Sequence, residues 1–540
     1  MAAQTELVLG LVGAVGTDLD LVSYETRAEL DEYGYSAEVV RLSDYLLDLP
    51  WAEDFEGRPE DERIWLAMDA GTKLRIETEH GDALALWAIS DILQTREREA
   101  TEFIEDGQEE HVANLDRKAW ILRSLKTPDE VATLRAVYGP RFVLFSAYSP
   151  EESRDAALAK TIRLSRGTND RAQWSYQPHD LIKRDHDENV SGGQDVEKTF
   201  HQADFFLDAS TPDALREDVV RSLEVLFGHP FRTPTKDEFA QFQASGAALR
   251  SAELGRQVGA AIATRDGSVV ALGTNEVPKA GGGAHWEEEG TGNREFELSQ
   301  IDTNRRAQNS IALELADMLR SRLNRVVEEV GGEDTAQLVD LYGKNLEQDL
   351  LAEKLRELTE FGRAVHAEMD SLLDAARRGV PVRGCSLHTT TFPCHNCARH
   401  IIGVGIMRVV FVEPYSKSRA SDLHAHDLRL GDSTADQGGA VRFDPFRGVA
   451  PRRYLEFFDM RARERAGQPR MDTEGCVRSD FDKRTAHPLF SDLEPEPFRP
   501  ELPAYRRREL LALANFEELS ERLTRPDGVP TDADGKKGAG

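Results

Sequence analysis

Two short motifs can bind one metal ion only if the fold brings them together. His366-Ala367-Glu368 forms the first motif, and Pro393-Cys394-His395-Asn396-Cys397 forms the second. One imidazole and two thiolates are ligands of Zn²⁺, and three protein ligands leave a fourth tetrahedral position for water, as in catalytic rather than structural sites. Cysteines at i and i+3 near the start of a helix can face one metal ion, and the helix amino terminus favours thiolates. The fold must therefore place His366 beside a helix that begins near Cys394.

The residues around these ligands predict hydrolytic chemistry. Coordination lowers the pKa of a bound water towards neutrality. Glu368 follows His366 by two residues, so it lies near the metal without binding it and can carry a proton from water to a substrate. The pattern His-x-Glu…Pro-Cys-x-x-Cys is the signature of zinc-dependent deaminases that act on nucleobases.

The alternative is a structural zinc clip, which would need a fourth protein ligand. His395 lies inside the Cys-x-x-Cys turn, where its side chain should point away from the metal. Cys385 is the other candidate, but it opens an apolar strand-like run and we expect it to be a small core residue.

Charge and composition restrict the partners of such a site. Acidic residues outnumber basic ones by 97 to 67, a net charge of −30, which argues against non-specific binding of nucleic acid but leaves room for a local pocket for a phosphorylated ligand. Only four cysteines occur, so no disulfide framework is expected. Glu6 stands where a signal peptide would have a basic residue, and no apolar run reaches the ~18 residues of a transmembrane helix. We expect a cytoplasmic protein with no membrane contact.

The first part of the chain alternates apolar strand-like runs with helical patterns, which is typical of an α/β sheet covered by helices. A helix is expected over Pro128–Val137, and a proline-containing joint over His229–Phe239 offers a helix start at Thr233. The expected strands are Leu7–Val12, Ala119–Leu122, Arg141–Phe145 and Asp204–Leu207.

The pattern changes after the joint. Short runs on either side of Arg265–Gly267 predict a hairpin, and Gly281–Asn304 reads as a long loop. Two charged amphipathic helices are expected across Arg305–Leu358, and a helix–strand–helix–strand order across Arg363–Val412. The expected domains are residues 1–230, residues 236–465 with a helical insertion at 281–360, a C-terminal extension at 466–523 and a disordered tail at 524–540.

Several segments resemble the deoxycytidylate deaminase family of the cytidine deaminase superfamily. The resemblance rests on HAEMD, on TTTFPCHNCARHIIGVGIMRVVFVEPYSKS and on VGAAIATRDGSVVALGTNEVP. It implies a three-layer α/β/α domain with a five-stranded mixed sheet and the zinc helices on one face. It also places Asn275 where the family binds the sugar 3′-hydroxyl, although simple turn chemistry is an alternative role for this residue. Tyr415 and Lys417 follow the last strand, where a base-stacking ring and a phosphate-binding cation would serve, or they are surface loop residues.

A wider resemblance links the whole chain to bacterial anti-phage dCTP deaminases. It rests on HPFRTPTKDEFAQFQASGAALRSAELGRQVGAAI, RSLKTPDEVATLRAVYGPRFVLF, GGQDVEKTFHQADFFLDAS and FDPFRGVAPRRYLEFF. Such proteins join an N-terminal P-loop kinase-like parallel sheet to a deaminase domain. The resemblance implies deamination of dCTP, or of dCMP, to uracil nucleotides, with nucleotide depletion in defence against phage. It further implies a homo-oligomer, a nucleotide effector and an inhibitory small RNA encoded nearby as partners.

The expected phosphate loop departs from that family. Gly13, Gly16, Thr17 and Asp18 form the loop, but aligned on Gly13 the positions of the second glycine, the lysine and the hydroxyl residue of G-x-x-x-x-G-K-[ST] hold Asp18, Leu19 and Asp20. No lysine precedes Lys73, and we expect no nearby residue to replace the lysine's charge. The domain is therefore expected to be a degenerate nucleotide-sensing or assembly module, or a purely structural one.

Two other functions compete with nucleotide deamination. A polynucleotide deaminase acting on flipped bases shares the zinc motif, but the net charge counts against it. A nucleotide kinase or NTPase with a regulatory deaminase domain would need the missing lysine. Arg452 and Arg453 could reach substrate phosphates or a neighbouring subunit, or be solvated charges.

Overall fold

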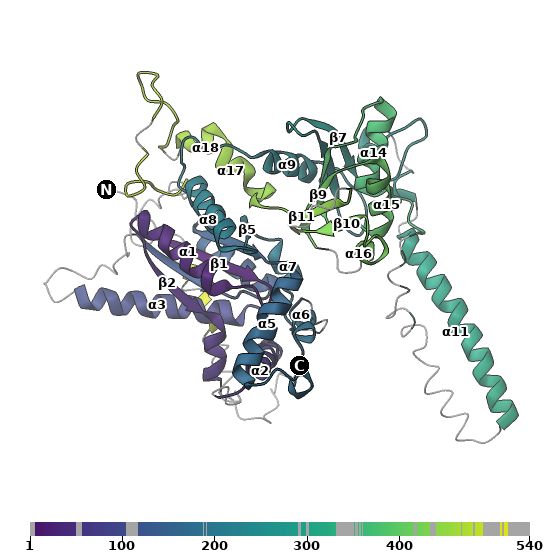
Figure 1. Ribbon diagram of the computed structural model, residues 1–540, viewed down its shortest axis with the longest axis horizontal. Helices are drawn as coiled ribbons and strands as arrows, with labels where there is room; N and C mark the ends of the chain where they lie inside the picture. Colours follow the sequence, from purple (N-terminus) through teal and green to yellow (C-terminus); the bar gives the residue numbers. More distant parts are fainter. Residues whose placement is uncertain are drawn as a thin grey trace, which may run out of the picture. The chain divides into compact units, whose positions relative to one another are not determined.

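The chain folds into two units, which the computed structural model places at Met1–Thr233 with Arg447–Gly540 and at Pro234–Phe446. We call them the N-terminal unit and the inserted unit. Figure 1 shows a sheet with surrounding helices in each. The described residues are 6–49, 57–103, 117–186, 188, 190, 192–289, 293–298, 302–330, 350, 355, 358, 360–414, 418–431, 439–465, 467–478, 481–489, 508–509 and 512–516.

The N-terminal unit is built on a six-stranded sheet in the order β12-β5-β4-β1-β3-β2. Neighbouring strands are parallel except for β12, which pairs antiparallel with β5. The expected strands are all present, but the sequence analysis missed β2, because its half-buried residues alternate only weakly between apolar and polar. The strands are β1 (Leu7–Gly13), β2 (Ser36–Arg41), β3 (Lys118–Arg123), β4 (Phe142–Tyr148), β5 (Phe205–Asp208) and β12 (Gly448–Val449).

Both faces of this sheet are covered. Side chains alternate between the two faces of a strand. In β1, Val8 and Val12 belong to one buried cluster, whereas Leu7, Leu9 and Leu11 belong to another. The helices of this part of the unit are α1 (Leu19–Glu32), α2 (Glu60–Thr78), α3 (Ala83–Phe103), α4 (Pro128–Tyr138), α5 (Glu151–Arg166), α6 (Pro178–His186), α7 (Val196–Phe200) and α8 (Pro212–Leu226).

The chain returns to the N-terminal unit after residue 446, earlier than the expected domain end at 465. Strand β12 pairs with β5, and Arg453 forms a 3.1 Å ion pair with the fully buried Asp204. Arg452 binds the same carboxylate, so both arginines are committed within this unit. The helices α17 (Tyr454–Phe458) and α18 (Met460–Arg465) follow. An antiparallel strand and a buried charge pair fix this return, and neither is visible in the local sequence pattern.

The expected C-terminal extension also packs on the N-terminal unit where it is described. Leu489 N donates to Leu226 O at 2.9 Å, and Arg96 forms an ion pair of 2.6 Å with the buried Glu509. The expected disordered tail at 524–540 lies outside the described residues.

The inserted unit holds a six-stranded mixed sheet in the order β10-β11-β9-β8-β6-β7, one strand more than expected. Strands β6 and β7 form the expected hairpin, β6 pairs antiparallel with β8, and the remaining pairs are parallel. The extra strand arises because the short β10 adds to the edge beyond β11. The strands are β6 (Gly259–Ala263), β7 (Val269–Thr274), β8 (Ser386–Thr391), β9 (Arg408–Glu413), β10 (Leu428–Leu430) and β11 (Val441–Pro445).

Two glycines show that helices cover opposite faces of this sheet. A Cβ at Gly259 would lie 2.0 Å from Ala244 O in α9 (Lys236–Ala248), whereas a Cβ at Gly273 would lie 2.1 Å from Ala367 O in α14 (Ala367–Arg378). Gly259 and Gly273 belong to adjacent cross-strand pairs, which face opposite sides of the sheet. Buried residues of α14 and of α15 (His395–Val404) share one cluster. The unit therefore has three layers, with α14 and α15 on one face.

Three local expectations change in the inserted unit. Helix α9 begins at Lys236 and is capped by Thr235 rather than Thr233, because Thr235 and Glu238 form a reciprocal capping box with each other's backbone N–H groups. The expected loop over 281–304 contains the short helices η5 (Glu287–Glu289) and α10 (Glu295–Leu298). The first amphipathic helix of the insertion is α11 (Thr303–Val330), and most of the second falls outside the described residues.

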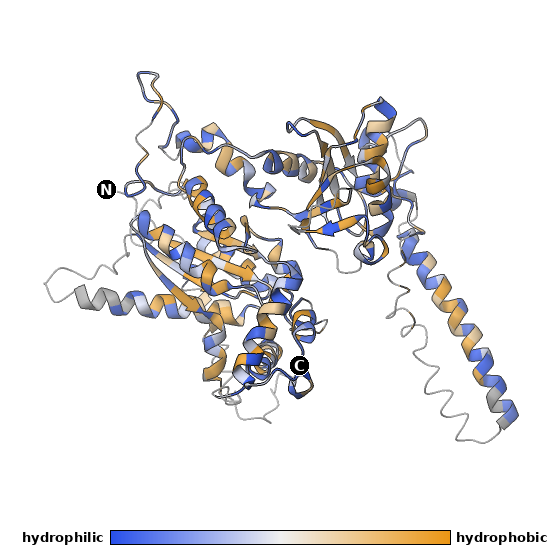
Figure 2. Ribbon diagram, in the orientation of Figure 1, coloured by the Kyte–Doolittle hydropathy of each residue, from blue (hydrophilic) through white to orange (hydrophobic). Residues whose placement is uncertain are grey.

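Figure 2 shows apolar strands in both sheets and more hydrophilic residues on the outer helices. This is the distribution expected of layers that bury apolar faces against each other. None of the helices in the described part of the chain is both long and apolar enough to cross a membrane.

We expect His388 on β8 to make the inserted unit sensitive to acid. Burial lowers the pKa of His388 to about 4, opposed by Asp237 and reinforced by Arg408. The unfolded chain then binds more protons than the folded one between the ordinary pKa of about 6.5 and pH 4, so stability falls as the pH drops through this window. The unfolding free energy, measured with urea, should fall between pH 7 and pH 4 by about 3 kcal/mol less in His388→Asn than in the unsubstituted protein. If the unfolding free energy fell by the same amount in both proteins, the role of His388 would be contradicted.

Candidate metal centre

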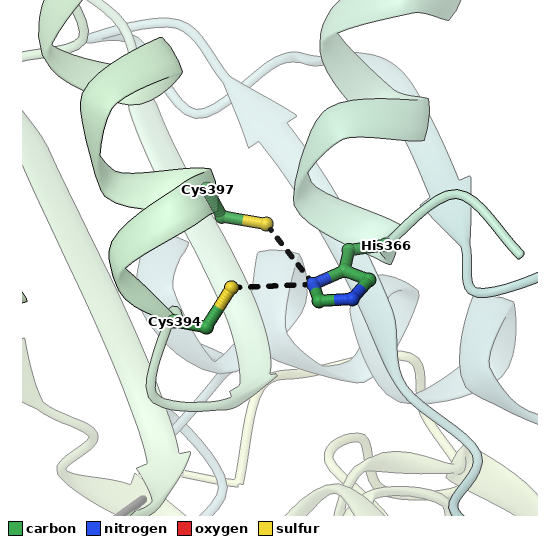
Figure 3. A group of neighbouring side chains, drawn as sticks. All are labelled: His366, Cys394 and Cys397. Atoms are coloured by element: carbon green, nitrogen blue, oxygen red, sulfur yellow. Dashed lines mark hydrogen bonds between the residues drawn. The ribbon is translucent and has the colours of Figure 1, made fainter. Parts of the chain in front are cut away.

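Two helix amino termini meet at the expected metal ligands. His366 is the residue that caps the start of α14, and Cys394 caps the start of α15. His366 Nδ1 lies 3.3 Å from Cys394 Sγ and 3.4 Å from Cys397 Sγ, and Figure 3 shows both sulfurs directed at this nitrogen. The structure thus brings together the three ligands that the sequence predicts.

The three atoms fit a tetrahedral zinc ion. Ligand atoms at about 2.3 and 2.1 Å from zinc, at a tetrahedral angle, lie about 3.6 Å apart. The observed nitrogen–sulfur distances of 3.3 and 3.4 Å are close to that separation, and all three ligand atoms lie within 4.8 Å of one another. In the described part of the chain, no further histidine, cysteine or carboxylate joins this group. Cys385 is buried in the apolar cluster instead, as expected.

Glu368 is the fourth member of the site. It lies in the first turn of α14 and its residue is only 4% exposed. Burial raises the pKa of Glu368, and its carboxyl group is within hydrogen-bonding reach of Cys397. A carboxyl with a raised pKa beside the metal ligands suits proton transfer near neutral pH.

The three ligands influence one another's protonation. A hydrogen bond from Cys397 lowers the pKa of Cys394, while the same contact and burial raise the pKa of Cys397. Hydrogen bonding to Cys394 raises the pKa of His366. These shifts favour a thiolate at Cys394, and metal binding would displace the protons that remain on the other ligands.

Glu276 supports the first ligand, and the sequence analysis did not identify it. Its backbone oxygen accepts from Val365 N at 3.0 Å, directly before His366. Its side chain, in a residue only 1% exposed, binds Arg294 at 2.8 Å and accepts from Ala252 N at 3.1 Å. Glu276 thus ties together three segments, one of which leads directly into His366. Its only sequence signal is its position directly after Asn275.

Asn275 holds the loop that precedes β6. Its side-chain oxygen accepts from Val258 N at 2.7 Å, and its side-chain nitrogen donates to Arg256 O at 2.6 Å. An asparagine side chain has two donor hydrogens and two acceptor lone pairs, so one of each is used here. The loop geometry therefore depends on Asn275.

Glu253, on the same loop, is a further residue that the sequence analysis missed. Its Oε2 atom is buried and has no hydrogen-bond partner among the described residues. Burial raises the pKa of Glu253, and its charge contributes to the raised pKa of His366. A buried carboxylate oxygen without a hydrogen-bond partner can accept a hydrogen bond from a bound ligand.

Other expected site residues are placed elsewhere or not described. Tyr415 and Lys417 lie outside the described residues. Gly13, Gly16 and Thr17 belong to the N-terminal unit, as does Asp18, whose carboxylate caps α1 by accepting from Leu21 N at 2.9 Å.

Replacing Glu276 should destabilise the inserted unit. Glu276→Gln removes the charge partner of Arg294, whose side chain is only 12% exposed, and a cation left without its partner in a buried site costs about 3 kcal/mol. Chemical unfolding should therefore show a lower unfolding free energy for Glu276→Gln than for the unsubstituted protein. The matched control is Glu289→Gln, which removes an exposed partner of Lys279 and should change little. Equal effects of the two substitutions would contradict the role assigned to Glu276.

The inserted unit is similar to known deaminases. Residues 234–413 match the family model described as the cytidine and deoxycytidylate deaminase zinc-binding region. The deoxycytidylate deaminase of Enterobacteria phage T4 is 38% identical over 55 residues, which is 10% of this chain and 28% of that protein. ComE operon protein 2 of Bacillus subtilis is 40% identical over 53 residues, 10% of this chain and 28% of that protein. Human deoxycytidylate deaminase is 35% identical over 54 residues, 10% of this chain and 29% of that protein.

These matches concern a part of each protein. The chain covers less than a third of the length of these relatives, 28% to 29%. A dCMP deaminase from the cyanophage S-TIM5, solved with dCMP and dUMP, aligns over 40% of this chain and 100% of that one at 16% identity, with a TM-score of 0.22 that is too low to support an inference. The family model and the His/Cys/Cys cluster agree on the cofactor. The inserted unit contains a segment that matches the cytidine and deoxycytidylate deaminase zinc-binding region, and its cofactor is Zn²⁺.

Proposed function

We propose that the inserted unit deaminates free deoxycytidine nucleotides, dCTP or dCMP, to the corresponding uracil nucleotides with release of ammonia. The observation that carries the proposal is the meeting of His366, Cys394 and Cys397 beside the buried Glu368. This donor set with an adjacent carboxyl group is the arrangement that hydrolytic deamination of a cytosine ring requires.

His366, Cys394 and Cys397 would hold the zinc ion through one nitrogen and two sulfurs. When bound, zinc makes water nucleophilic near neutral pH and acts as a Lewis acid. The amino termini of α14 and α15 both point at the cluster, which favours the thiolate charge. The hydrogen bonds of Val365 and Glu276 keep His366 oriented towards the sulfurs.

Glu368 would move the protons of the reaction. Its buried carboxylate accepts a proton from the water that attacks C4 of the cytosine ring and passes it to N3. It then moves the second proton of that water from the new hydroxyl on C4 to the amino nitrogen, which leaves as ammonia, so one water is consumed for each ammonia released. The raised pKa of Glu368 suits both directions of transfer, because a proton shuttle works best with a pKa near the operating pH.

The substrate groups outside the ring would contact the loop before β6. Asn275 positions this loop, and the open Oε2 atom of Glu253 offers an acceptor for a sugar hydroxyl. Tyr415 and Lys417 remain candidates for base stacking and phosphate binding. The net charge of −30 favours a free nucleotide over a polynucleotide. The wider resemblance supports dCTP depletion in phage defence as the biological role, with a nucleotide effector and an inhibitory small RNA as regulators.

The zinc ligands can be tested by metal analysis. Cys394→Ser removes one of three ligands, and we expect zinc affinity to fall by more than about a hundredfold, beyond the loss that a supporting partner gives. Cys385→Ser is the matched control, because this buried thiol lies outside the cluster and its loss should leave the zinc content unchanged. Competition with a chelator followed by elemental analysis measures both. Zinc retained by Cys394→Ser would exclude Cys394 as a ligand.

The role of Glu368 can be tested by separating metal binding from turnover. Glu368→Gln should keep the zinc ion but lower ammonia release from dCTP or dCMP by about a hundred- to ten-thousandfold, since it removes proton transfer alone. Asp374→Asn, at a half-buried position later in the same helix where the carboxylate pairs with Arg377, should leave turnover unchanged. Full activity of Glu368→Gln would refute the mechanism. Faster deamination of single-stranded DNA than of free nucleotides would refute the proposed substrate class.

A further inference from the structure

The loop between β1 and α1 lies where ligands of parallel α/β sheets bind. Strand β1 lies between β3 and β4. The connection that leaves β1 runs to β2 at one side of the sheet, whereas the connection that leaves β4 runs to β5 at the other side. The carboxyl end of a strand at such a point is the usual ligand crevice, and backbone N–H groups before a helix bind anions there. The location is therefore that of a phosphate site, although the sequence lacks the expected lysine.

A buried carboxylate already occupies this loop. Asp185, at the end of α6, is completely buried, and its Oδ2 atom accepts from Val15 N in the loop at 2.6 Å. Its Oδ1 atom is 2.7 Å from Lys126 Nζ, which follows β3. One loop amide and one lysine, the two kinds of donor that bind a phosphate group, thus converge on a side chain of the protein itself.

A second cation closes the loop from α5. Arg154 donates to Val15 O at 3.3 Å and to Ser149 O at 3.1 Å. Burial lowers the pKa of Arg154, and the negative charges of Glu151 and Asp185 oppose that shift. The expectation that no nearby group replaces the missing lysine is therefore wrong. Lys126 and Arg154 come from distant segments that only the fold brings to the loop.

The loop packs closely against α5 at Gly16. Gly16 has φ +89°, and a Cβ built on it would lie 2.8 Å from Arg154 O. A phosphate placed beside Asp185 would also meet a like charge in a poorly hydrated site. The Asp185 carboxylate and a bound phosphate therefore exclude each other.

We propose that the β1–α1 loop is an anion-binding site whose resident anion is the Asp185 carboxylate. The site has the donors for a phosphate-bearing ligand such as pyrophosphate or a nucleotide phosphate chain, but it accepts one only when Asp185 is neutralised or displaced. The N-terminal unit accordingly does not bind phosphate at this loop in the state described here. This inference is independent of the proposed deamination, which belongs to the inserted unit.

Pyrophosphate binding tests the proposal on the full-length, zinc-loaded protein. Asp185→Asn removes the charge while keeping the shape of the side chain, so Lys126 loses its anionic partner. Calorimetric titration should show pyrophosphate binding to Asp185→Asn that is at least about tenfold, or about 1.4 kcal/mol, tighter than any binding to the unsubstituted protein, whose residual binding should not depend on Lys126. Pyrophosphate should also raise the melting temperature of the variant alone. Adding Lys126→Met to Asp185→Asn should abolish the gain.

Either of two results would overturn the proposal. In the first, the unsubstituted protein binds pyrophosphate and Lys126→Met abolishes the binding, which would mean that the loop accepts phosphate despite Asp185. This measurement does not depend on the folding of Asp185→Asn. The second is a folded Asp185→Asn protein that binds pyrophosphate no better than the unsubstituted one. Zinc content and nucleotide turnover play no part in these readouts, so failure of this proposal and failure of the proposed function remain distinguishable.

Discussion

The site of the inserted unit depends on the approach of two helix amino termini. His366 and Cys394 each cap a helix, α14 and α15, and these helices lie on the same face of one sheet. Strand β8 leads directly into α15, whereas α14 follows the insertion and packs closely on the sheet at Gly273 of β7. The positive amino ends of the two helix dipoles stabilise thiolates, so the fold itself favours the charged form of the cysteine ligands. Glu368 shares the first turn of α14 and so follows His366 into the same buried space.

The metal site lies in the inserted unit, whose residues interrupt the sequence of the N-terminal α/β unit. The return after residue 446 is secured by β12 and by two arginines on the buried Asp204. A carboxylate with no exposure needs cationic partners, since an unpaired buried charge is costly. The N-terminal unit uses this principle at Asp204 and again at Asp185, where Lys126 supplies the charge that the loop sequence lacks.

Local sequence patterns predicted the elements and ligands that depend on nearby residues. The metal motifs, the hairpin around Arg265–Gly267 and four strands of the first sheet follow from spacing and periodicity, and all are present. The misses depend on contacts between distant segments: β2, the edge strand β10, the early return at β12, and the roles of Glu276 and Lys126. No local pattern marks a carboxylate whose partner lies far along the chain.

The central claim is that water attacks the cytosine ring of a free deoxynucleotide in the inserted unit. The most direct measurement is mass spectrometry of the nucleotide recovered after zinc-loaded protein is incubated with dCTP or dCMP in oxygen-18-labelled water. We expect a uracil nucleotide that carries one labelled oxygen on the ring, accompanied by an equal amount of ammonia. Recovery of the cytosine nucleotide unchanged, with zinc bound to a folded protein, would contradict the account.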